Sequence, residues 1–291
     1  MTTQQAPLLN APQLNLYELL AQYGPSTQSF YIDPEKSTVL KGNKGTRLLV
    51  PPFSLTSLSG KPAKGTVEIR LKEVFSQSDM VLAGRPTTSE DRLMESGGQI
   101  LVSANQGHSP LKLSHPITTA LPVSQKLQNP MAMRLFVGST ATFRPYSFGQ
   151  GFDWKMASGK AVGIRKVEKQ KHYQFPLQDL NWAGCEFFVA RKSSRCMVTA
   201  RLVSPVEQFD SLLGYLVFKD IHAVARMYPG KHNCTAVNIP EKLAATAYII
   251  GFSKGKLSCG SGFLRRASDK LVNVKMRQVL EKELIETLKG I

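Results

Sequence analysis

The chain lacks the features that would assign it to a membrane or a secretory class directly. None of its apolar runs reaches the roughly 18 residues that suggest a membrane-spanning helix. Residues 1–5 carry neither a basic segment nor an apolar segment, so no secretory signal is expected. Two locations stay open: the periplasm or outer-membrane surface if the chain is a processed form, and the cytoplasm if its N-terminus is native.

Motifs for nucleophilic, phosphate-binding and metal chemistry are missing as well. There is no G-x-S-x-G elbow, and Gly260-Ser261-Gly262 is more typical of a flexible turn. No Gly-rich stretch ends in the Lys-Ser/Thr of a P-loop. Two histidine pairs lack the fixed spacing of metal ligands: His108 with His115, and His222 with His232. We therefore expect a protein that is not an enzyme and that holds no metal and no cofactor.

Cysteine is sparse, and its spacing excludes a disulfide scaffold. The four cysteines are Cys185, Cys196, Cys234 and Cys259, and none has the short spacing of a zinc or redox motif. The turn residues at 192–194 predict that Cys185 and Cys196 lie on the two arms of one hairpin, too far apart for a bridge. We expect free and mostly buried thiols. A buried structural role for Cys185 is favoured over a nucleophile, because Trp182 and Phe187 flank it.

What the chain does contain is β-strand patterning over 291 residues, enough for two domains. Residues 66–74 alternate between apolar and charged side chains, which predicts a strand with one wet face. The predicted fold is mainly β, with two antiparallel β-sandwich domains, a short N-terminal helix and a C-terminal amphipathic helix. The predicted segments are a tail and short helix (1–27), a first sandwich (28–123), an irregular basic connection (124–172), and a second sandwich with the C-terminal helix (173–291).

The net charge of +16 is unevenly distributed. Residues 1–150 hold 14 basic and 9 acidic side chains, whereas residues 151–291 hold 23 and 12. A basic excess favours anionic partners, although a solvated surface gives the same charge. Specific nucleic-acid binding is less favoured, because no groove-reading motif accompanies the basic segment. The candidate anion-binding residues are Lys160, Arg165, Lys166, Lys169, Lys171, Arg265 and Arg266.

The last predicted element covers residues 277–288. Leu280, Leu284 and Leu288 recur every four residues and therefore stack along one helix face. A helix this short needs tertiary packing to persist in water. We expect these leucines to dock either on the second sandwich or on a partner protein.

Two stretches of the chain carry a resemblance to a known family. The first contains Gly45-Thr46, Val50-Pro51-Pro52, Gly65-Thr66-Val67, Glu73-Val74, Pro86-Thr87-Thr88, Glu95-Ser96-Gly97-Gly98-Gln99 and Ala104. The second contains Trp182-Ala183-Gly184-Cys185-Glu186 with Phe188, followed by Leu216-Val217-Phe218 and Asn238-Ile239-Pro240. They resemble a Bacteroidota cell-envelope family whose members are often lipoproteins. The first stretch resembles its ZU5-like β-sandwich module, and the second is similar to its second β domain, which has a Trp-x-x-Cys-Asp/Glu motif with Asp commoner than Glu. ZU5-like modules sometimes cleave themselves at a His-Phe-Ser step, which this chain does not contain.

The resemblance carries over no catalytic residue. It implies a non-catalytic adaptor or structural component of an envelope-associated assembly, working through protein–protein contacts. The alternative, from the charge, is an anion-binding protein that takes nucleic acid or an acidic glycan through its basic second half.

Overall fold

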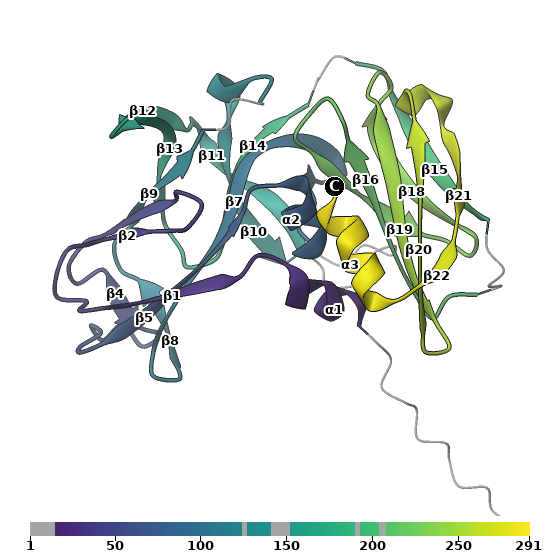
Figure 1. The fold of residues 1–291 in the computed structure, drawn as a ribbon. Helices are drawn as coiled ribbons and strands as arrows, with labels where there is room; N and C mark the ends of the chain where they lie inside the picture. The colour runs from purple at the N-terminus through teal and green to yellow at the C-terminus, as the bar shows by residue number, and fades with distance from the viewer. Residues whose placement is uncertain (1–14, 124–126, 141–151, 190–192, 204–207) are drawn as a thin grey trace, which may run out of the picture.

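A computed structural model describes residues 15–123, 127–140, 152–189, 193–203 and 208–291 (Figure 1). The fold is mainly β, as predicted, with several antiparallel sheets and three α-helices in the described residues. We call strands β1 to β14 the first β unit and strands β15 to β22 the second β unit. In Figure 1 they form the left and right parts of the molecule, with the α-helices between them.

The first β unit is a sandwich of two sheets. The larger sheet has the order β1-β5-β7-β14-β10-β11, with β4, β6 and β8 attached. These strands are β1 (Thr27–Ile32), β4 (Leu55–Ser57), β5 (Val67–Val74), β6 (Thr88–Ser89), β7 (Arg92–Gln106), β8 (Ser109–Leu113), β10 (Arg134–Thr140), β11 (Phe152–Ala161) and β14 (Trp182–Phe188). The smaller sheet has the order β12-β13-β9-β3-β2. Its strands are β2 (Thr38–Lys41), β3 (Arg47–Val50), β9 (Ile117–Pro122), β12 (Gly163–Val167) and β13 (Gln170–Leu177).

The core of this sandwich follows from the alternation in the sequence. In β5, Val67, Ile69 and Leu71 are fully buried, while Arg70 between them is exposed. The buried side chains pack on residues of the smaller sheet such as Leu48 and Leu121. The prediction of a strand with one wet face at residues 66–74 is therefore confirmed.

The second β unit is one sheet of eight strands in the order β21-β15-β18-β17-β16-β19-β20-β22. The strands are β15 (Arg195–Val203), β16 (Ser211–Phe218), β17 (Val224–Pro229), β18 (Asn233–Pro240), β19 (Ala245–Ser253), β20 (Lys256–Leu264), β21 (Leu271–Lys275) and β22 (Arg277–Val279). The pairing of β15 with β21 is parallel, unlike the antiparallel pairing that we predicted throughout. β21 also packs beside β20, where Val272 and Val274 lie against Gly262 and Gly260, so the sheet folds over on itself.

Three helices lie where the two β units meet (Figure 1). They are α1 (Leu16–Tyr23), α2 (Gln77–Leu82) and α3 (Glu281–Lys289); the short 3-10 turns at Pro130–Ala132 and Ala267–Asp269 lie elsewhere. Their apolar faces join a cluster that draws on both units, which we call the junction core. It includes Leu20 of α1, Met80 of α2 and Leu284 of α3, together with Trp182 of the first unit and Tyr215 of the second.

Strand β14 was expected to open the second sandwich, but the structure places it in the first. It pairs with β7 on one side and with β10 on the other. Ala183 and Cys185 face the sandwich core, while Trp182 and Phe188 face the junction core. A strand that is apolar on both faces needs neighbours on both edges and cover on both faces, which only a central position supplies.

Two further expectations about chain organisation are corrected. The stretch from 124 to 172 is not an irregular connection, because its described residues form β10, β11 and β12 of the first unit, and β13 also belongs there. Cys185 and Cys196 do not share a hairpin, since β14 and β15 lie in different sheets. The four cysteines are free and buried, as expected. None of the helices in the described residues is long and apolar enough to cross a membrane.

Candidate functional site

The candidate anion-binding residues lie in two separate parts of the fold. Arg165 and Lys166 on β12, and Lys169 and Lys171 at the following turn and strand, are all exposed. Lys160 belongs to β11, but its side chain lies outside the described residues.

The remaining pair, Arg265 and Arg266, is exposed directly after β20. Figure 1 shows β12 and β20 at opposite ends of the molecule. The structure thus yields one basic hairpin and one separate arginine pair rather than a common basic surface.

The three leucines predicted to dock do not behave alike. Leu284 and Leu288 are buried in the junction core within the same chain. Leu280 is 72% exposed, because it precedes the first turn of α3 rather than lying inside the helix. Ile285 is buried as well. The buried face of α3 therefore consists of Leu284, Ile285 and Leu288 instead of the three predicted leucines.

Two motifs of the family resemblance, residues 95–99 and 182–186, lie on the adjacent strands β7 and β14. β7 and β14 pair so that Ser96 is opposite Glu186 and Gln99 is opposite Gly184. The hydroxyl of Ser96 donates to Oε1 of Glu186 at 2.9 Å. Oε2 of Glu186 is buried and has no hydrogen-bond partner. Burial raises the pKa of Glu186 well above its usual range, and the nearby Glu95 adds to the effect, so both favour the protonated carboxyl.

A pocket of about 500 Å³ lies beside this carboxyl. Strand pairing explains its lining: Arg134 is the cross-strand neighbour of Glu186, and Phe136 is the neighbour of Met156. Phe187 and Phe188 complete the mainly apolar wall. An apolar pocket with one buried hydrogen-bonding group is the usual form of a small-molecule site. Sequence reasoning did not select Glu186 as a site residue, although an acid between Cys185 and two phenylalanines was a signal for it.

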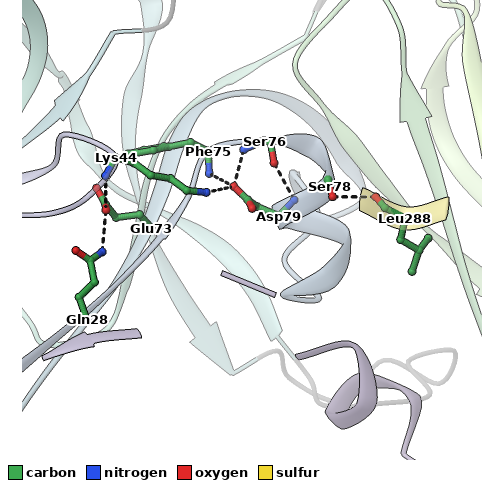
Figure 2. Close-up of polar contacts among 8 residues, drawn as sticks. All are labelled: Gln28, Lys44, Glu73, Phe75, Ser76, Ser78, Asp79 and Leu288. Atoms are coloured by element: carbon green, nitrogen blue, oxygen red, sulfur yellow. Dashed lines mark hydrogen bonds and ion pairs between the residues drawn. The ribbon is translucent and has the colours of Figure 1, made fainter. Parts of the chain in front are cut away.

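A second buried carboxylate organises the end of the first unit next to the helices (Figure 2). Glu73 is buried and accepts hydrogen bonds from the backbone N–H of Lys44, the backbone N–H of Thr46 and the side-chain amide of Gln28. The distances are 2.8, 3.0 and 2.9 Å. Three donors from two segments converge on this side chain, so Glu73 holds the 42–46 turn against β5. Its role is structural.

The same view shows how the first turn of α2 is held on two sides (Figure 2). Asp79 accepts from the backbone N–H groups of Phe75 and Ser76 and pairs with Lys44 Nζ at 2.6 Å. The capping box of Ser76 and Asp79 begins the helix. On the other side, the hydroxyl of Ser78 donates to the carbonyl of Leu288 at 2.8 Å, which joins α2 to α3. The helices therefore link the two units by polar contacts as well as by packing.

Among the described residues, no group of three or more His, Cys, Asp and Glu is placed to hold a metal ion. Comparison of this chain with family models, with curated proteins and with solved structures found no match.

Proposed function

We propose that this protein is a non-catalytic adaptor or structural component of a cell-envelope-associated assembly that acts through protein–protein contacts. The observation that carries the proposal is the junction core. It draws apolar side chains from both β units and from all three α-helices, so the two units share one continuous interior. A two-part body of this kind holds two surfaces at a constant distance from each other.

An exposed apolar pair on the first unit supports a partner surface. Val39 on β2 and Leu49 on β3 are direct cross-strand neighbours, and they are 59% and 40% exposed. Phe53, just beyond β3, is also exposed. Among the described strands, β2 is the last of its sheet and pairs only with β3, so its other edge can take up a further strand. We assign the outer face of β2 and β3 as the partner-binding surface of the adaptor.

Cross-linking followed by affinity purification from the native host tests the proposal. The tagged wild-type chain should recover one stoichiometric partner. Val39→Lys combined with Leu49→Lys should lose that partner without a change in melting temperature, because both side chains are exposed. Met197→Lys is the matched control, since Met197 is equally exposed but lies on β15 of the second unit. A wild-type chain that recovers nothing and runs as a monomer refutes the proposal.

The alternative function is binding of a polyanion by the hairpin of β12 and β13. Lys166 and Lys171 are direct cross-strand partners. Like charges placed opposite each other destabilise a sheet, and a bound polyanion would relieve that cost. Binding of a heparin-type glycan to this hairpin should fall steeply with salt. Lys166→Gln with Lys171→Gln should reduce the salt dependence, whereas Arg265→Gln with Arg266→Gln should not; a flat salt response eliminates this alternative.

A further inference from the structure

An unpaired arginine lies inside the junction between the two β units. The guanidinium carbon of Arg85 is 4.2 Å from the ring centroid of Phe152 and 4.7 Å from that of Trp182. Nη1 of Arg85 donates to the carbonyl of Gly84 at 3.0 Å. Nε is buried and has no hydrogen-bond partner. The aromatic rings hold the guanidinium in place but leave much of its donor capacity unused.

A second arginine, Arg226, lies on β17, the strand that runs beside the segment containing Arg85. The backbone N–H of Thr87 donates to the carbonyl of Val224 at 2.7 Å, and the N–H of Val224 donates to the hydroxyl of Thr87 at 3.0 Å. These two bonds place the segment that follows α2 alongside β17. The pKa of Arg85 is lowered, first by burial and then by the charge of Arg226. Nε of Arg226 is likewise buried without a partner.

A buried hydroxyl completes the cluster. Tyr215 on β16 is the cross-strand neighbour of Arg226 and is 1% exposed. Its hydroxyl has no hydrogen-bond partner, although buried tyrosine hydroxyls usually find one. Trp182, on which Arg85 packs, and Tyr215 belong to the same junction core, and Arg226 is the strand neighbour of Tyr215, so the three groups lie in one region of the junction. The junction therefore contains two guanidinium groups and one phenol whose donors are not all used.

The chain itself offers this cluster little negative charge. In the described residues, neither Arg85 nor Arg226 forms an ion pair with an acid. Lys72 on β5 adds a third positive charge, close enough for Arg85 to lower its pKa after burial has done so. By sequence, the segments 1–14, 124–126, 141–151, 190–192 and 204–207 contain a single acid, Glu207. Like charges that are partly buried and unpaired are costly, so a counter-ion from solution is favoured.

We propose that Arg85, Arg226 and Tyr215 form a binding site for a phosphate-type dianion, either a free phosphate or a phosphate monoester. Two guanidinium forks and a phenolic O–H supply directed donors to several acceptor oxygens. Two unit charges on the anion balance the two arginines. The site is distinct from the β12–β13 hairpin, and it does not depend on the proposed adaptor function.

Thermal melting in inorganic phosphate and in sodium chloride of equal ionic strength tests the site. For the wild type, the melting temperature should be about 3–6 °C higher in phosphate, once phosphate exceeds its dissociation constant about 100-fold. Arg226→Gln should lose this gain. In chloride the same variant should melt at or above the wild-type temperature, because a like charge has been removed. Arg201→Gln is the control, since Arg201 is exposed on β15, and it should keep the full gain.

A second variant distinguishes a loss of phosphate binding from a general loss of stability. Tyr215→Phe deletes only the hydroxyl, and calorimetry should show phosphate binding weakened about 5- to 10-fold with melting in chloride unchanged. Flotation with vesicles that contain phosphatidic acid separates the two sources of phosphate. Flotation that depends on Arg226, without a response to free phosphate, assigns the site to a lipid headgroup. The proposal is overturned if neither probe binds, if Arg226→Gln keeps the phosphate gain, or if Arg201→Gln loses it equally.

Discussion

The packing of α3 leads to a quantitative prediction about Leu284. This side chain is fully buried in the junction core, and α3 has only nine residues. Leu284→Ala removes apolar contacts within the junction core and leaves a cavity that extends an existing pocket of about 190 Å³ between α3 and the second β unit. Core Leu→Ala changes cost about 2–5 kcal/mol, and we expect about 3 kcal/mol here because part of the new space opens to water. The melting temperature should fall by about 5 °C.

Urea unfolding followed by tryptophan fluorescence measures this effect, because Trp154 and Trp182 both lie in the junction core. Leu280→Ala is the matched control, since Leu280 precedes the same helix but is exposed. It should change the free energy of unfolding by no more than about 0.5 kcal/mol. Both variants should unfold in one transition, because the helix packs on a core that the two units share. A loss below about 1 kcal/mol for Leu284→Ala, or an equal loss for the control, refutes the assignment of α3 to this core.

Three further predictions test other parts of the structure. Trp182 is 8% exposed, as its apolar neighbours predicted, and Trp182→Ala should cost about 3–5 kcal/mol in urea unfolding. Glu73→Ala leaves three converging N–H groups without their acceptor and should cost about 3 kcal/mol by the same assay. Glu186 has a raised pKa in the folded state, so the stability associated with its protonated form is complete below the unfolded pKa and is lost as pH rises. Glu186→Gln should therefore melt at a higher temperature than the wild type at pH 8 and at nearly the same temperature at pH 4; equal curves at both values contradict a neutral Glu186.

The chemistry of the candidate sites was only partly visible in the sequence. The basic residues near 165–171 could be found because neighbouring positions stay together on a hairpin. Glu186 and Ser96 are ninety positions apart, and only the pairing of β7 with β14 joins them. Arg85 lies in the segment after α2, whereas Tyr215 and Arg226 lie on β16 and β17, and no local pattern indicates that the three meet.

Local patterning in the sequence determined the secondary structure of many segments. Alternation at 66–74 predicted β5, and the leucine spacing near the C-terminus predicted a helix, because side-chain periodicity reflects one buried face. Local patterning did not indicate which sheet contains β14, because a strand that is apolar on both faces fits the centre of either β unit. The tertiary structure decided that point and the exposure of Leu280. Strand partners and shared cores depend on contacts between residues far apart in the chain, and short-range periodicity contains no information about those contacts.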